Sequence, residues 1–178
     1  MDTINSYDAA RMKRVFQRNS SRQKLFMLLY IESNWIGWDV FPIQSIVRGL
    51  FDADPQVRTR TVEVICQGGK FVSREVVLDV FRLVEDVNPF VREAVVENFH
   101  RLREQIRPSE LIKILQYLVH HESVVRDSAT RAIDQIEHLI TEELMTVVVN
   151  LYQEEQNLEI KNSIGEFLVM KVNEYLID

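Results

Sequence analysis

Hydrophobic positions along the chain recur with a period of about 34 residues, which lies in the range that repeat proteins use. The clearest marker is a Val-Arg pair at 57–58, 91–92 and 125–126, which follows a short polar segment each time. Apolar columns before and after this pair keep the same spacing. The columns are Ile46, Val80, Ile114 and Val148; then Leu50, Val84, Leu118 and Tyr152; then Ile65, Phe99 and Ile133, followed by Phe167 or Leu168. Several columns in one register predict a repeat protein.

Each repeat is predicted to form two helices. In the third repeat, the apolar residues at 76, 77, 80, 81 and 84 fall at helical spacing. Asn88-Pro89 then predicts the start of a second helix, because asparagine is a favoured N-cap and proline loses nothing at the first helical position. Asp54-Pro55 has the same role one repeat earlier. Such a pair cannot bury its apolar face alone, so the pairs are expected to stack.

The same spacing sets the expected repeat boundaries. Moving back by one period from Arg58 reaches Lys24, so residues 1–33 are predicted to form an N-terminal cap repeat. Terminal repeats are often atypical because one side faces water. The other expected helix-pair repeats are 42–67, 73–104, 108–140 and 141–178, within a single domain that covers 1–178.

The bend motif resembles that of the HEAT-repeat family. The matching features are an Asp or Asn near the bend, often followed by Pro, and then Val-Arg, with Ala129 at the family's small position. The short bacterial form of this repeat, also found in phycobilin lyase subunits, is the most similar. The resemblance implies an all-α, right-handed solenoid of about five helix pairs. It also implies that the second helices line a concave, ligand-binding side.

The basic column is predicted to be structural. Arg58, Arg92 and Arg126 stand at the start of the second helices, and Asp54, Asn88 and Glu122 stand at the preceding bends. We expect a ladder in which each arginine pairs with the bend residue of its own or the next repeat. Phosphate binding is the weaker alternative, since basic rows without a surrounding positive field are usually paired.

The positions one and five after the basic column are expected to project from the concave side. They are Thr59, Glu93, Asp127 and Asn162, and then Glu63, Glu97, Arg131 and Glu166. This face is mainly acidic, which suits another protein with a basic surface and would repel nucleic acid. A merely solvated helix face is the alternative.

Net charge bears on the class of partner. The chain carries a formal charge of −6, and its pI is about 5.3, which counts against a nucleic-acid binder. The charge is uneven: residues 1–24 sum to +4 and residues 134–178 sum to −8. Ends of opposite sign either support head-to-tail association or simply differ as two solvated ends.

Aromatic residues stand in an unusual place at Trp35, Trp38 and Phe41, in a connection between repeats. Polar residues are expected there. Trp35 and Trp38 either anchor a partner or cover the open edge of the core beneath the cap repeat.

No catalytic, cofactor-binding or metal-binding residue is predicted. The single cysteine, Cys66, is expected to be a small buried hydrophobe, with a Cys66–His100 pair as a weaker alternative. His120-His121 lies near a bend, but no further ligand stands at metal-binding spacing. No phosphate-binding loop or nucleophile elbow occurs.

These features predict a cytoplasmic, non-catalytic scaffold or adaptor that binds a basic peptide or protein surface. The chain lacks a secretory signal and an apolar run long enough for a membrane span. One alternative is a partner of an enzyme, such as a bilin-lyase-type HEAT protein. Another is a nucleic-acid-binding HEAT-like protein that uses its basic N-terminal helix.

Overall fold

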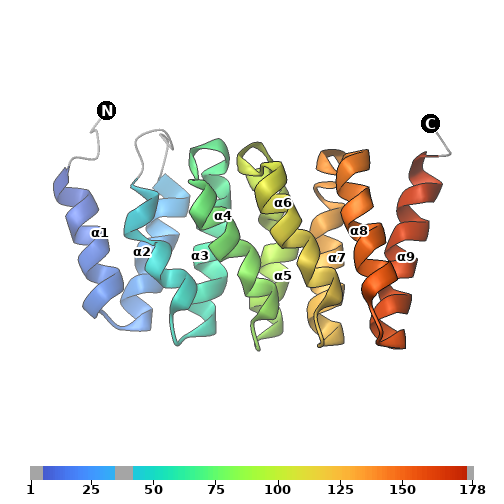
Figure 1. The fold of residues 1–178 in the computed structure, drawn as a ribbon. Helices are drawn as coiled ribbons and strands as arrows, with labels where there is room; N and C mark the ends of the chain where they lie inside the picture. The colour runs from blue at the N-terminus through green and yellow to red at the C-terminus, as the bar shows by residue number, and fades with distance from the viewer. Residues whose placement is uncertain (1–5, 35–41, 176–178) are drawn as a thin grey trace. The chain divides into compact units, whose positions relative to one another are not determined.

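The computed structural model describes residues 6–34 and 42–175, which form helices and connecting turns with no strand among them (Figure 1). The chain divides into two compact units, Met1–Gln105 and Ile106–Asp178, called unit 1 and unit 2 below. The prediction of an all-α protein built from packed helix pairs is therefore confirmed. The single right-handed solenoid over 1–178 stays a prediction.

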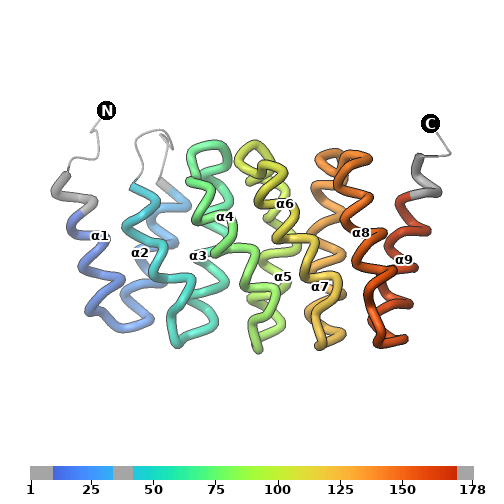
Figure 2. Tube along the Cα trace, viewed as in Figure 1, coloured from blue at the N-terminus to red at the C-terminus, as the bar shows by residue number. Residues whose placement is uncertain are grey.

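Unit 1 opens with a pair of antiparallel helices, α1 (Ser6–Arg18) and α2 (Ser21–Asn34), which pack against each other (Figure 2). The elements after residue 41 alternate between first and second helices of later repeats. They are the 3-10 turns η1 (Ile43–Ser45) and η2 (Val47–Phe51), then α3 (Pro55–Gln67), η3 (Gly69–Phe71), α4 (Arg74–Phe81), η4 (Arg82–Glu85), α5 (Pro89–Asn98) and η5 (Phe99–Gln105). The second helices α2, α3 and α5 lie side by side, with α3 in contact with both neighbours.

The bends of unit 1 have the predicted helix starts. Asp54 Oδ1 accepts a hydrogen bond from the Gln56 amide at 2.9 Å, and Asn88 Oδ1 accepts one from the Phe90 amide at 2.9 Å. A proline occupies the first position of α3 and of α5. Each cap satisfies an amide that the helix itself leaves without a partner.

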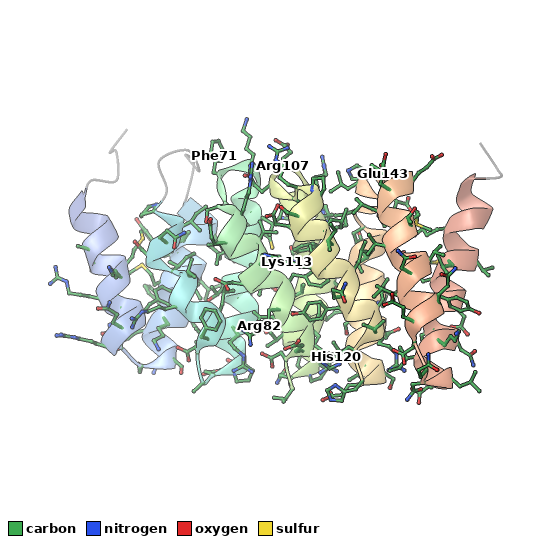
Figure 3. All side chains as sticks on the ribbon, in the orientation of Figure 1. Phe71, Arg82, Arg107, Lys113, His120 and Glu143 are labelled. Atoms are coloured by element: carbon green, nitrogen blue, oxygen red, sulfur yellow. The ribbon has the colours of Figure 1, made fainter. Side chains whose placement is uncertain are left out.

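Unit 2 contains the last two helix pairs. Its elements are α6 (Pro108–Leu115), η6 (Gln116–Val119), α7 (Ser123–Asp134), η7 (Glu137–Leu139), α8 (Glu142–Glu154) and α9 (Leu158–Tyr175). Helix α9 packs against α8, α7 and η6. The first turn of α8, marked by Glu143, lies at the opposite end of the unit from the bend that carries His120 (Figure 3). The buried Lys171 amine of α9 pairs with Asp134 at 3.0 Å and Glu137 at 2.8 Å.

The apolar columns form the cores of the two units. Ile46, Val80, Ile114 and Val148 are all fully buried. In the next column, Leu50, Val84 and Leu118 are buried, but Tyr152 is exposed. The reason is local geometry: α8 continues as an α-helix through Glu154, whereas α4 and α6 tighten into 3-10 turns at the equivalent point. A change from 3.6 to 3.0 residues per turn rotates the side chains that follow.

Candidate functional site

The arginine column holds the bends of unit 1 together. Arg58 Nε and Nη2 donate to the two carboxylate oxygens of Asp86 at 2.6 and 2.7 Å, and Nη1 donates to the carbonyls of Asp52 and Ala53 at 2.7 and 3.1 Å. The hydrogen bond to Asp86 raises the pKa of Arg58 above its usual value. Nη1 thereby holds the bend before α3, while Nε and Nη2 join it to the next bend.

In unit 1 the ion pairs of the ladder have a constant spacing, but their carboxylates differ from those expected. Lys24 pairs with Asp52 and Arg58 with Asp86, which is a separation of 28 residues in both cases. Asp54 and Asn88, the expected partners, are helix caps instead. Both acceptor positions are two residues upstream of the cap, and their carboxylates face the preceding repeat.

Two further arginines complete the predicted ladder set. Arg92 Nη1 donates to the carbonyls of Asp86 and Val87 at 2.7 and 3.3 Å. In unit 2, Arg126 Nη1 donates to the carbonyls of His120 and His121 at 2.8 and 3.1 Å, and Nη2 pairs with Glu159. These bonds occupy the arginines in structural roles.

The predicted partner-binding residues fall into two groups, one in each unit. Thr59 and Glu63 lie on α3 and Glu93 and Glu97 on α5, so these four share the second-helix side of unit 1. Asp127, Arg131, Asn162 and Glu166 are all exposed and lie on α7 and α9 of unit 2, which contact each other.

A groove of about 590 Å³ opens on the second helices of unit 1. Residues of α2, α3, α5 and the bend before α5 line it: Leu25, Leu29, Pro55, Gln56, Thr59, Arg60, Asn88 and Phe90. Phe90 is 75% exposed and Leu29 is 45% exposed. A large ring left in water at the edge of an apolar hollow is typical of a surface that binds a partner.

A carboxylate cluster adjoins this groove through Arg60. Arg60 Nη1 lies 3.1 Å from Glu32 Oε2 and 2.8 Å from Glu63 Oε2, and Gln67 Nε2 donates to Glu32 Oε1 at 3.3 Å. Burial raises the pKa of Glu63 above its usual value, and the charges of Glu32 and Glu97 push it in the same direction. Two carboxylates thus pair with one guanidinium, and the charge of Glu97 also acts on Glu63, which leaves the cluster with an excess of negative charge.

Sequence reasoning found the acidic part of this face and missed its apolar part. Counting from the basic column selects Glu63 and Glu97 but not Leu29, Phe90 or Arg60. A usable signal was present: Phe90 stands one repeat after the polar Gln56, at a position where the helix phase predicts exposure. An aromatic residue at a solvent-facing position is the kind of exception that marks a binding surface.

The groups with potential chemistry are arranged for packing. Cys66 is fully buried, and that burial raises the pKa of its thiol to about 12. The expected role as a small buried hydrophobe is therefore confirmed. The rings of His120 and His121 lie 4.4 Å apart, and His120 Nδ1 accepts from the Glu122 amide at 3.1 Å. Across 6–34 and 42–175, no three His, Cys, Asp or Glu side chains are placed to hold a metal ion.

Two predictions concern other parts of the chain. Trp35 and Trp38, the possible aromatic anchors, lie outside the described residues. None of the helices in the described part of the chain has the length and apolar character needed to cross a membrane.

Comparison with known proteins finds no match: no family model, curated protein or solved structure is similar to this chain.

Proposed function

We propose that this chain is a non-catalytic binding scaffold that holds a peptide segment in the groove on α2, α3 and α5. The segment has an apolar side chain next to Lys or Arg. The observation that carries the proposal is the exposed Phe90 ring at the edge of a groove of about 590 Å³, beside a cluster of three carboxylates.

The apolar part of the groove supplies the binding free energy in this account. Leu29 of α2 and Phe90 of α5 line the hollow from helices on either side of α3, so one aliphatic or aromatic side chain of the partner fills the space between them. Burying an exposed aromatic anchor at the centre of an interface contributes about 2 kcal/mol or more. The polar surroundings exclude water without adding much affinity.

The carboxylate cluster supplies the specificity. Glu32 and Glu97 both repel Glu63, and Arg60 alone pairs with Glu32 and Glu63, so a cationic side chain of the partner relieves that repulsion. An acidic partner meets a penalty at the same place. Charge of this kind selects the partner and speeds its association more than it adds affinity.

We also propose that the helix pairs form one HEAT-like solenoid. The support is the repeat register of the sequence together with ion pairs that recur at a separation of 28 residues, from Lys24 to Asp52 and from Arg58 to Asp86. Repeats of this kind contact only their neighbours and present long binding surfaces.

Selection from a random-peptide library displayed on phage tests the binding proposal. Enriched peptides are expected to share one large apolar residue with a Lys or Arg within a few positions of it. Phe90→Ala removes the anchor and should weaken an enriched peptide by about 2 kcal/mol, or roughly 30-fold.

Glu97→Lys and Val124→Ala serve as comparison variants. Glu97→Lys should weaken peptides in proportion to their positive charge. Val124 is also exposed, but it lies on α7 in unit 2, so Val124→Ala should leave binding unchanged. Enrichment of acidic peptides, or equal binding by wild type and Phe90→Ala, would contradict the proposal.

A further inference from the structure

A second hollow, which differs from the proposed peptide groove in its charge, opens on α1 and α2. Its volume is about 740 Å³. Its lining combines Arg11, Arg14 and Arg22 with apolar side chains such as Val15, Phe26 and Met27. Phe26 is 74% exposed, so a large ring lies in water among these cations. The surface formed by these residues is called the basic outer face below.

The cations of the basic outer face, and Lys13 and Arg18 on the same helix α1, lack an ion-pair partner among the described residues. Arg11, Lys13, Arg14, Arg18 and Arg22 are all exposed, and within the described residues none of them forms an ion pair. Lys24 and Arg60, by contrast, are paired with Asp52 and with Glu32 and Glu63. The unpaired positive charge at the start of unit 1 is therefore concentrated on α1 and the first turn of α2.

Unit 2 carries a charge of the opposite sign. Residues 106–178 contain thirteen acidic residues against six basic ones, which gives −7. Four exposed glutamates on α8 and α9 lack an ion-pair partner among the described residues: Glu142, Glu143, Glu154 and Glu166. Exposed apolar side chains lie on the same two helices, namely Val149, Tyr152, Leu158 and Val169.

We infer that the basic outer face of α1 and α2 binds the acidic α8–α9 surface of a second copy of this chain, head to tail. Both surfaces combine unpaired charge with exposed apolar side chains, and the signs are complementary. Such a contact joins two different surfaces, so it leaves one free surface of each kind and grows into longer assemblies or closes into a ring. The hollow shares Leu25 and Leu29 with the peptide groove, but its arginines belong to the outer face alone. Variants of those arginines therefore test this inference independently of the groove.

A nucleic acid is the alternative polyanionic partner for the basic outer face. The observations favour a second copy of this chain over a nucleic acid. A strand of nucleic acid follows a continuous positive track. Beyond α2, the column residue Arg58 is already bonded to Asp86, and the chain as a whole carries −6. A compact basic patch on an acidic protein fits a compact acidic surface better than an extended strand.

Sedimentation velocity of the full chain over a range of concentrations tests the inference. Wild type should form dimers and larger species as concentration rises at low salt. Raising the salt from about 0.02 M to about 0.5 M should weaken this association at least about tenfold, because the charges are then screened over a few ångströms.

Two blocked variants separate the surfaces. The head variant, Arg11→Glu with Arg14→Glu, and the tail variant, Glu142→Gln with Glu143→Gln and Glu154→Gln, should each stay monomeric. Mixed together, they should form a dimer that does not grow, because only one intact head and one intact tail remain. Arg82→Glu with Arg103→Glu makes the same charge change at exposed sites elsewhere in unit 1 and should assemble as wild type does.

Several results would overturn the inference. One is a wild type that stays monomeric at low salt and high concentration. Another is a head variant that assembles as well as wild type, or a mixture that grows beyond the dimer. A third is a monomeric wild type whose outer face instead binds single-stranded RNA, with binding lost in the head variant. Circular dichroism of each variant shows whether it is folded, and a tail surface altered at Glu166 alone provides a milder second test.

Discussion

Two glycines show how the space around a single Cα decides the effect of a methyl group. A Cβ on Gly49 would lie 2.2 Å from Thr61 Oγ1 and 2.9 Å from Phe16 Cε1. The Thr61 hydroxyl is held by its own bond to the Val57 carbonyl at 2.7 Å, so it does not move away freely. Gly49 therefore allows η2 to approach α3 closely.

We predict that Gly49→Ala lowers the free energy of unfolding by about 1–3 kcal/mol, because the new methyl group overpacks the core. Gly165→Ala is the matched control. Gly165 lies inside α9, and the nearest atom to its Cβ is Tyr152 Cε2 at 3.4 Å. Alanine there should stabilise by about 0.5–1 kcal/mol, because it favours the helix over the unfolded chain. Urea unfolding measures both, and an opposite order of the two variants would show that this account of packing is wrong.

Cys66 makes stability depend on pH at the alkaline end. Its folded pKa of about 12 lies above the value of an unfolded thiol, so the native state holds the proton more tightly. Its contribution to stability is complete below the unfolded pKa of about 8.5 and is lost as pH rises toward the folded pKa. Wild type should therefore lose about 2 kcal/mol by pH 10 relative to a variant that cannot ionise there.

Cys66→Ala provides that comparison. Alanine costs some packing at every pH, but the difference between the two proteins should shrink as pH rises from about 8 to about 10. A constant difference over this range would mean that the thiol ionises equally in the folded and unfolded chain. The same burial predicts that the native protein resists alkylation until it unfolds.

At the scale of helices, the ladder arginines contribute unequally to stability. Arg58 donates to two carbonyls of its own bend and makes a two-point contact with Asp86, whereas the bonds of Arg92 described above go to carbonyls alone. The side chains of Arg58 and Asp86 are largely buried. Loss of one partner then leaves a charge without compensation.

We predict that Arg58→Ala destabilises the protein by about 3 kcal/mol and Arg92→Ala by roughly half as much or less. Arg58→Lys should recover only part of the loss, because an amine cannot reproduce the two parallel bonds. Thermal and urea unfolding provide the measurement. Equal losses for Arg58→Ala and Arg92→Ala would show that the carbonyl bonds, and not Asp86, carry the stabilisation.

The helix starts were predictable from sequence, and the ladder partners were not. Asp54-Pro55 and Asn88-Pro89 are local signals, since cap and first turn involve neighbouring residues. The acceptor of Arg58 is 28 residues away, and each bend of unit 1 offers more than one polar side chain that could meet it. The backbone path through the bend decides which of these polar side chains faces the preceding repeat.

A second role of the acceptor position explains its place in the repeat. Asp52 and Asp86 each accept a bond from the amide two residues later, at 3.0 and 2.9 Å. His120 Nδ1 and Glu155 Oε1 do the same in unit 2, at 3.1 and 2.7 Å. The shared role of this column is therefore to close the bend by accepting a hydrogen bond. A histidine fills that role although it brings no negative charge. Asp52, Asp86 and His120 keep the repeat spacing, but only two of the three are carboxylates, so the spacing alone does not identify the ladder partners.

At the scale of the whole chain, the candidate site was only partly predictable. The acidic residues beside the groove follow in part from counting along one repeat, because Glu63 and Glu97 share a column. The apolar side needs α2, α3 and α5 to be placed together, because Leu29 and Phe90 come from different repeats and belong to no common column. A binding surface whose residues come from several repeats leaves no recognisable pattern within any single repeat.

Charge is divided between the two units in a way that bears on both proposals. Unit 2 carries −7, so the remaining residues sum to +1 within a total of −6. The unpaired cations of α1 do not line the groove of unit 1, and its one charged lining residue, Arg60, is paired with Glu32 and Glu63 beside it. Local pairing and not net charge therefore decides which partner each surface binds.

Chemical-shift mapping by NMR tests the central claim most directly, using a peptide enriched in the library selection. We predict that the peptide shifts amide signals near Leu29, Thr59, Phe90 and Glu97, and that Phe90→Ala abolishes these shifts at the same peptide concentration. Shifts confined to other helices, or shifts that persist unchanged in Phe90→Ala, would contradict the claim that the groove on α2, α3 and α5 is the binding site.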